Sequence, residues 1–112
     1  MEFVPLNKTI TMDLSQADWV TQQETFDHVV ILDVRTPEEF ESGHIPKAQN
    51  LDILQAQSFM EEVSNLTPDS HYFIYCRSGA RSAQACQILN QSGIANVYNL
   101  LGGIIEWEGP TE

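Results

Sequence analysis

A cysteine lies among scarce positive charges in the stretch Cys76-Arg77-Ser78-Gly79-Ala80-Arg81-Ser82. The chain has only five Lys and Arg residues in all, and two of them are in this stretch. The thiolate form of cysteine is the nucleophile, and it is stabilised by nearby arginines and by the N-terminus of a helix. Because an apolar, strand-like run precedes Cys76 and a helical pattern follows it, we predict that Cys76 is a nucleophile held as a thiolate.

The loop that follows Cys76 also has the features of an anion-binding site. Backbone N–H groups at the start of a helix can point at a bound anion, and Gly79 permits a positive φ or a close backbone approach. Arginine side chains keep their charge and can hold an oxyanion by two hydrogen bonds. The loop side chains that would supply hydroxyl and guanidinium donors are Arg77, Ser78, Arg81 and Ser82.

Two reactions fit a thiolate in an anion cradle. The thiolate can attack phosphorus in a phosphate ester, or it can attack the outer sulfur of an anion such as thiosulfate and become a persulfide. Four residues separate Cys76 from Arg81, whereas cysteine phosphatases have five in the same place. The shorter loop favours a sulfur atom over a phosphorus centre with three equatorial oxygens. Asp52 and Asp69 are candidates for a general acid, but nothing in the sequence directs either one at the loop.

The segments around this loop alternate between strand and helix patterns. The apolar runs over residues 29–34 and 71–75 predict strands buried on both faces. Thr36, Pro37 and Glu39 form a capping-box pattern, which predicts a helix over 37–42 that ends at Gly43. Other strands are expected over 9–12, 48–51 and 96–100, and other helices over 15–23, 56–66, 81–91 and 103–108. The inward-facing residues of the longer helices are expected to be Leu14, Trp19, Val20, Phe59, Met60, Val63, Leu66, Ala85, Cys86 and Leu89.

This alternation predicts a single α/β domain over residues 1–112. We expect a doubly wound, mainly parallel five-stranded sheet with helices on both faces. In such sheets ligands bind beyond the carboxyl ends of the strands, which is where Cys76 lies. The length of 112 residues and the 42% hydrophobic content are enough for a core without disulfides or metals.

Charge and cysteine usage exclude several classes of function. The formal net charge of −11 makes nucleic acid and anionic membrane surfaces poor partners. The two cysteines, Cys76 and Cys86, are too few for a disulfide scaffold, and no zinc-ligand spacing is present. The N-terminus has no signal-peptide pattern, and no apolar run approaches the ~18 residues of a membrane span. We therefore expect a cytoplasmic protein without metal or cofactor.

Four segments, in this order and spacing, resemble a single-domain rhodanese. They are Leu32-Asp33-Val34-Arg35-Thr36-Pro37-Glu38-Glu39-Phe40, Gly43-His44-Ile45-Pro46, the loop from Cys76 to Ser82, and Leu101-Gly102-Gly103-Ile104 with Trp107. The resemblance runs from about residue 9 to residue 107. It implies a small α/β domain with a mainly parallel five-stranded sheet. It also implies sulfur transfer through a cysteine persulfide, often assayed from thiosulfate to cyanide. One departure is Lys47, where many members have glycine.

The resemblance also implies roles for individual residues. Cys76 would be the nucleophile and persulfide carrier, Arg77 and Arg81 would bind the anionic donor, and Ser82 belongs to the same binding loop. The amides of the residues after Arg77 would surround the sulfur, namely those of Ser78, Gly79, Ala80 and Arg81. Asp33 and Arg35 are expected to form a structural charge pair near the site.

Several alternatives stay open at this level. Cys86 is expected to be a buried, unreactive thiol, and the alternative is a resolving cysteine that forms a disulfide with Cys76. The protein as a whole could instead be a cysteine-dependent phosphatase or arsenate reductase, or a non-catalytic docking module that presents its acidic face. The expected partners are a small anionic sulfur donor, a thiol or cyanide acceptor and a sulfur-relay protein. The sequence names neither the physiological donor nor the acceptor.

Overall fold

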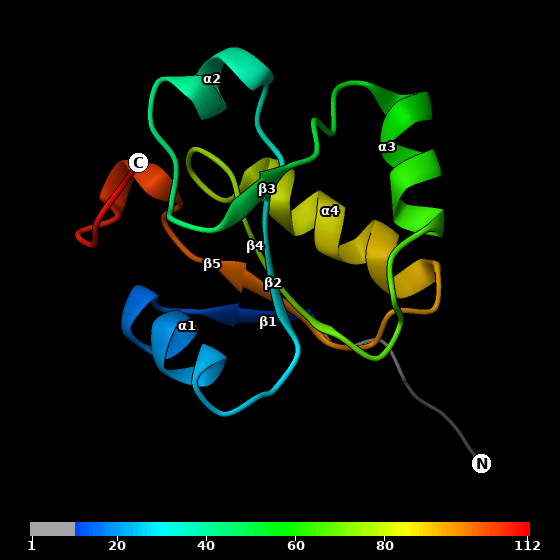
Figure 1. The fold of residues 1–112 in the computed structure, drawn as a ribbon, viewed down its shortest axis with the longest axis horizontal. Coiled ribbons are helices and arrows are strands. Elements are labelled where there is room, and N and C mark those ends of the chain that lie inside the picture. Colours follow the sequence, from blue (N-terminus) through cyan, green and yellow to red (C-terminus); the bar gives the residue numbers. More distant parts are fainter. Residues whose placement is uncertain (1–10) are drawn as a thin grey trace.

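Five parallel strands form one sheet in a computed structural model that describes residues 11–112 (Figure 1). The strand order is β1-β5-β4-β2-β3, and every neighbouring pair is parallel. The predicted α/β sheet is therefore confirmed. The strands are β1 (Thr11–Leu14), β2 (Val29–Asp33), β3 (Ala48–Asn50), β4 (His71–Tyr75) and β5 (Val97–Leu100).

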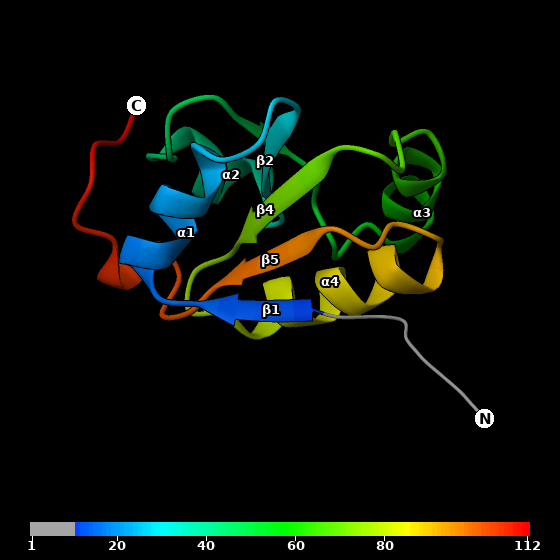
Figure 2. The same cartoon turned by 90° about the horizontal axis from the view of Figure 1, so that it is seen from below.

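Helices cover both faces of this sheet, as the alternation of elements predicts (Figures 1 and 2). Their bounds are α1 (Gln16–Gln23), α2 (Pro37–Glu41), α3 (Ala56–Ser64), α4 (Ala80–Gln91) and the 3-10 helix η1 (Ile104–Glu106). On one face, α3 and α4 bury Phe59, Val63 and Leu89 against the strands. On the other face, the core contains Trp19 of α1, with Ile104 and Trp107 packed against it. None of the helices in residues 11–112 is long and apolar enough to cross a membrane.

Some boundaries and core positions differ from the sequence-based expectation. The first strand covers Thr11–Leu14, and Thr9 and Ile10 lie outside the described residues. Val20 and Met60 were expected to face inward, but they are 39% and 46% exposed, so both predictions are wrong. Each neighbours a fully packed side chain on a short helix, and successive helical residues point about 100° apart. The expected closing helix is only a single 3-10 turn.

The register of the two central strands brings two loops together. Asp33 at the end of β2 pairs with Tyr75 at the end of β4, so the segments that follow these residues leave the sheet side by side. The first segment leads through Thr36 into α2, and the second is the loop that begins at Cys76. The carboxyl edge of a parallel sheet is where ligands bind in doubly wound folds. The candidate site is therefore built between these two loops.

Candidate active site

The sulfur of Cys76 lies at the start of α4 and is hydrogen-bonded from two sides. The residue is 1% exposed. The backbone N–H of Gly79 donates to Sγ at 3.0 Å, and the Oγ of Ser82 lies 3.3 Å from Sγ. Gly79 is the N-cap of α4 and has a φ of 115°, a left-handed conformation that glycine adopts without strain. This conformation accompanies the hydrogen bond from the Gly79 amide, so the loop places a donor on an atom that can carry negative charge.

The Ser82 hydroxyl can serve both protonation states of the cysteine. Its Oγ donates to the carbonyl oxygen of Gly79 at 3.1 Å, and in that arrangement the neutral thiol donates to Oγ. When the thiol loses its proton, the hydroxyl can turn and donate to the thiolate instead. Ser82 is fully buried, so no bulk water competes for this role. The hydroxyl thus favours deprotonation.

The balance of burial and hydrogen bonding lowers the pKa of Cys76. Burial by itself raises the pKa of the thiol, because it penalises the charged form. The Ser82 hydroxyl and the amides of Ser82, Gly79 and Ser78 outweigh this effect and lower the pKa below its ordinary value. Ser78, Gly79 and Ser82 therefore all act on the Cys76 sulfur. The place of the Ala80 and Arg81 amides in a persulfide cradle stays a prediction.

The loop that begins at Cys76 is held in place by backbone hydrogen bonds from the segment after β5. The N–H groups of Ile104 and Ile105 donate to the carbonyl oxygens of Cys76 and Arg77 at 3.0 and 3.1 Å. Gly103 has a φ of 61°, and a Cβ there would collide with those same two carbonyl groups. The signal of this close backbone approach in the sequence was the pair Gly102-Gly103, which follows β5 after a single intervening residue.

The structure contains the charge pair expected between Asp33 and Arg35. Arg35 donates from Nε to both carboxylate oxygens at 3.0 Å and from Nη2 to Oδ2 at 2.6 Å. Both side chains are buried, and Arg35 also donates to the carbonyl of Gly43 at 2.7 Å. Asn50, which the sequence did not single out, donates to the carbonyl oxygens of Asp33 and Arg35 at 3.0 and 2.9 Å. The ion pair of Asp33 and Arg35 therefore stabilises the loop before α2.

Arg81 is engaged by a residue that sequence reasoning placed only in a helix cap. Its Nη1 and Nη2 donate to the two carboxylate oxygens of Glu39 at 2.9 and 3.0 Å. Glu39 also completes the capping box with Thr36, which confirms that prediction. The Arg81 hydrogen bond, helped by Thr36, lowers the pKa of Glu39 to about 2 despite the opposing effect of burial. Arg77, in contrast, is exposed and forms no ion pair with the residues of the described chain.

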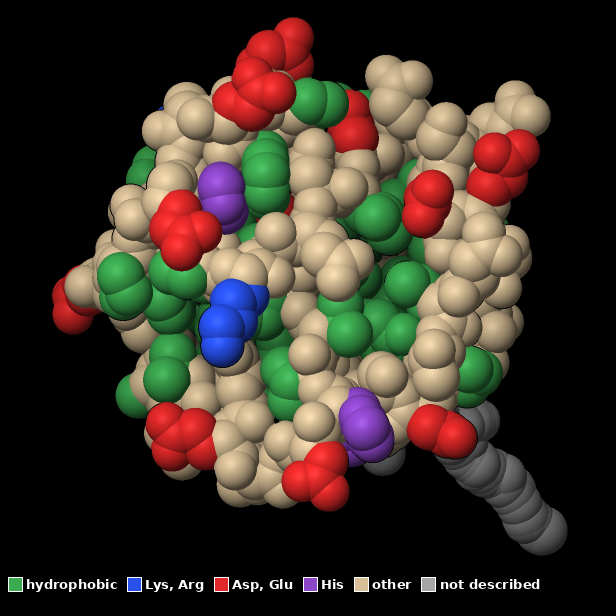
Figure 3. All heavy atoms as spheres, viewed as in Figure 1, with side chains coloured by type: hydrophobic (Ala, Val, Ile, Leu, Met, Phe, Trp, Pro, Cys, Tyr) green, Lys and Arg blue, Asp and Glu red, His purple; other side chains and the backbone are tan. Residues whose placement is uncertain are grey.

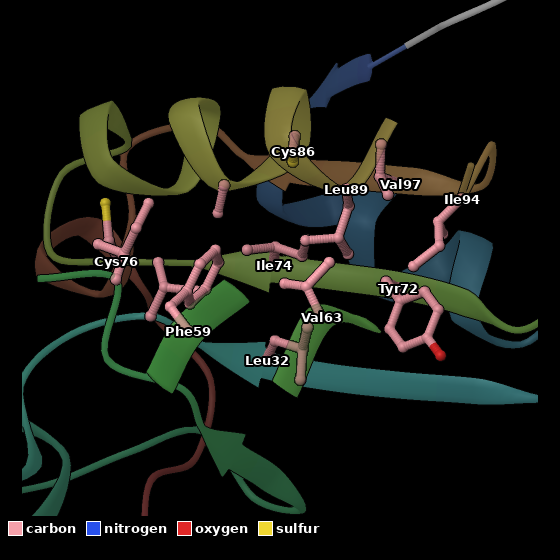
Figure 4. Packing of buried hydrophobic residues seen from close by; sticks show 13 residues of the cluster. Leu32, Phe59, Val63, Tyr72, Ile74, Cys76, Cys86, Leu89, Ile94 and Val97 are labelled. Atoms are coloured by element: carbon pink, nitrogen blue, oxygen red, sulfur yellow. The ribbon is translucent and has the colours of Figure 1, made fainter. Parts of the chain in front are cut away.

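Cys86 is buried like Cys76, but it lies in the interior of α4 and not in the loop before the helix. Figure 4 shows it farther along the helix, away from the loop that carries Cys76. It is 0% exposed, and burial, together with the charges of Asp13 and Cys76, raises the pKa of its thiol to about 12. These features fit the expected buried, unreactive thiol.

The other candidate groups have structural partners or lie away from the loop. Asp52 accepts a hydrogen bond from the backbone N–H of Leu54 at 3.0 Å, and Asp69 is exposed in the turn before β4. His44 stacks on Phe40 with ring centroids 3.9 Å apart. Within residues 11–112, no group of three His, Cys, Asp or Glu side chains gathers where it could hold a metal ion.

Comparisons with known proteins agree with this architecture. The family model of the rhodanese-like domain matches residues 16–110. A sulfurtransferase from Allochromatium vinosum is 47% identical over 79 residues, which are 70% of this chain and 71% of that protein. The putative sulfurtransferase YtwF from Bacillus subtilis is 33% identical over 100 residues, which are 89% of this chain and 93% of that protein. A crystal structure of a rhodanese-like domain protein from Staphylococcus aureus superposes with a TM-score of 0.76 at 28% identity, covering 91% of this chain and 97% of that chain.

The chain therefore belongs to the rhodanese-like domain family. Several of its relatives carry the name sulfurtransferase, so the family is one of sulfurtransferases. The predicted resemblance and the predicted fold are both confirmed by these matches. One departure from the family pattern also gains a physical meaning. Lys47, at a position where the resemblance led us to expect glycine, has a φ of 71°, a conformation in which glycine carries no strain.

Proposed function

We propose that this protein moves sulfane sulfur from a donor to an acceptor through a persulfide on Cys76. The thiolate attacks the outer sulfur of the donor, so that a bond forms between Sγ and that sulfur. The bond between the sulfane sulfur and the rest of the donor breaks, and its electron pair leaves with sulfite or with a thiolate. A thiophilic acceptor, cyanide or a thiol, then attacks the outer sulfur of the persulfide and regenerates the Cys76 thiolate.

The observation that carries this proposal is the hydrogen bond from the Gly79 amide to Sγ at 3.0 Å. An amide in this position stabilises the attacking thiolate before the reaction, and it stabilises the same sulfur when the thiolate is regenerated as leaving group. The N-terminus of α4 adds its dipole to the same end of the site. The spacing of four residues between Cys76 and Arg81 also favours a single sulfur atom over a phosphorus centre with its three oxygen atoms.

The donor and the acceptor belong to the same proposal. The donor would be a small anion such as thiosulfate or a thiol persulfide, and the acceptor cyanide, a low-molecular-weight thiol or the thiol of a sulfur-relay protein. The face in Figure 3 carries acidic side chains spread over its surface and few basic ones. With a net charge of −11, the surface favours a relay protein that is not itself strongly acidic, and it disfavours nucleic acid.

A load-and-discharge experiment tests the proposal. The protein is treated with thiosulfate or glutathione persulfide, freed of excess donor, and then mixed with cyanide, and thiocyanate is measured. We expect one equivalent of thiocyanate per chain from the wild type and from Cys86→Ala, and none from Cys76→Ser. Failure of every sulfane donor to load the wild type would contradict the proposal. Hydrolysis of an aryl phosphate that is lost in Cys76→Ser would support the phosphatase alternative instead.

A further inference from the structure

Two of the three arginines in the segments after β2 and β4 form ion pairs with carboxylates, and the third forms none within residues 11–112. Arg35 is neutralised by Asp33 and Arg81 by Glu39, with N–O distances of 2.6 and 2.9 Å for the two pairs. Arg77 is exposed and has no such partner among the described residues. Among the described residues, Arg77 is therefore the loop arginine that no carboxylate compensates, whereas Arg81 is already paired with Glu39. A donor with two negative charges would need the second arginine as well.

The charge of Arg81 interacts with the charge of Cys76. Its pKa is raised, first by the hydrogen bond with Glu39 and to a lesser degree by the charges of Cys76 and Asp33. The hydrogen bonds that reach Sγ come from Gly79 and Ser82, while both terminal nitrogens of Arg81 donate to Glu39. The guanidinium therefore lies within electrostatic reach of the thiolate but is turned toward α2.

Glu39 is itself held in place, so the pair is prepared before any donor binds. Its Oε1 accepts from the backbone N–H and from the hydroxyl of Thr36, each at 3.1 Å. A carboxylate already fixed by a helix cap loses little freedom when it forms a two-point pair with arginine. Both side chains are only about three-quarters buried, being 26% and 30% exposed. The ion pair is therefore held in place, yet a ligand can still reach both side chains.

We propose that Glu39 determines donor specificity: it withholds Arg81 from the bound donor and thereby favours thiol persulfides over the thiosulfate dianion. The inference rests on the proposed function and names the donor class for it. Attack on thiosulfate gathers three negative charges at the sulfur, and sulfite leaves with two of them. Attack on a neutral persulfide RSSH gathers one, since the Sγ–S bond forms while the electron pair of the RS–S bond leaves on RS⁻. In a partly buried site each unbalanced charge is costly.

Kinetics of persulfide formation on Cys76, followed by mass spectrometry, test this inference. We expect the wild type to react with glutathione persulfide about a hundredfold faster than with thiosulfate at equal concentration. The variant Glu39→Gln, which leaves Arg81 with an uncompensated charge, should gain about tenfold with thiosulfate and change less than about twofold with glutathione persulfide. Glu38→Gln removes the same charge from an exposed position of the same helix and should leave the ratio of the two rates unchanged.

A second background separates the action of Arg81 from that of a bare negative charge. In an Arg81→Gln background, Glu39→Gln removes only an unpaired carboxylate and frees no arginine, so its gain with thiosulfate should be much smaller than in the wild-type background. An equal gain in that background, or an equal gain from Glu38→Gln, would overturn the inference. So would a wild type that uses both donors equally well, a result that needs no variant and holds even if Glu39→Gln fails to fold. Loading by both donors at equal rates would refute only the role of Glu39, whereas loading by neither would refute the proposed function.

Discussion

One buried cysteine lies in the loop that leads into α4 and another lies in the middle of that helix, and the pKa values of their thiols shift in opposite directions. Cys76 precedes the first turn and Cys86 lies inside the helix, and their exposures are 1% and 0%. Burial disfavours both thiolates, yet the pKa of Cys76 is lowered while burial raises that of Cys86 to about 12. The difference comes from the hydrogen-bond donors around each sulfur. Cys76 receives hydrogen bonds from the Ser82 hydroxyl and from backbone N–H groups at the start of α4. In a helix interior such N–H groups are already bonded to backbone carbonyls. Reactivity therefore follows hydrogen-bond donors and not exposure.

The largest expected effect comes from disturbing the support of the reactive end. Gly103→Ala places a Cβ against the carbonyls of Cys76 and Arg77. We expect it to lower the free energy of unfolding by about 3 kcal/mol and to slow persulfide formation. Gly93→Ala is the matched control, because Gly93 also has a positive φ, 99°, with nothing within 4 Å of the added carbon. Chemical denaturation of both variants measures the difference, and equal losses would show that the contact with the loop carbonyls is unimportant.

Removing the positive charge of Arg81 in the first turn of α4 tests whether electrostatics contribute to the difference between Cys76 and Cys86. Arg81→Ala leaves the Glu39 carboxylate unpaired near the sulfur, so the thiolate of Cys76 should be disfavoured. We expect persulfide formation at neutral pH to slow by about thirtyfold with either donor. Lys47→Ala, which removes one positive charge from an exposed position outside the loop, should change the rate little. An unchanged rate in Arg81→Ala would show that Arg81 does not stabilise the thiolate of Cys76.

The hydroxyl at the reactive end has a smaller and pH-dependent effect. Ser82→Ala removes the first of the groups that lower the pKa of Cys76. The pKa of Cys76 should therefore rise, and the pH profile of alkylation by iodoacetamide should move to higher pH, so that the rate near pH 7 falls by about tenfold. Ser92→Ala, at the far end of α4, removes a hydroxyl that donates only to the carbonyl of Ile88 and should leave the profile in place. A profile that does not move in Ser82→Ala would argue that the amides alone hold the thiolate.

The smallest effect is expected in the middle of the helix. Cys86→Ala leaves a small cavity in the core cluster that contains Ala85 and Leu89, and we expect a loss of about 1 kcal/mol in the free energy of unfolding. Sulfur transfer should be unchanged, because Cys86 takes no part in it. A loss of turnover without a loss of stability would revive the role of a resolving cysteine.

The elements of this fold could be predicted because local signals agreed with the tertiary structure. The capping box at Thr36, the apolar run of β4 and the stripe of Ala85, Cys86 and Leu89 each give the same answer in the sequence and in the structure. Val20 and Met60 were misplaced because helical periodicity alone does not say which edge of an apolar stripe meets the sheet. The closing helix expected over 103–108 is only the turn Ile104–Glu106, since few residues carry its pattern.

The site could be predicted where one local segment supplies it, and not where it depends on contacts across the fold. Cys76, Gly79 and Ser82 are close in sequence, so their spacing was informative. Glu39 and Arg81 are brought together only by the adjacency of the loops that follow β2 and β4. Asn50 and Gly103 act through backbone groups of distant segments, and side-chain chemistry gives no sign of such partners.

The most direct test of the account is to locate the sulfur after a brief exposure to glutathione persulfide. Intact-protein mass spectrometry followed by peptide mapping distinguishes the two cysteines within the same molecule, so each serves as the control for the other. The account predicts a gain of one sulfur atom, found on Cys76, with Cys86 unmodified and no gain at all in Cys76→Ser. Sulfur on Cys86 at a comparable rate, or on neither cysteine, would contradict it.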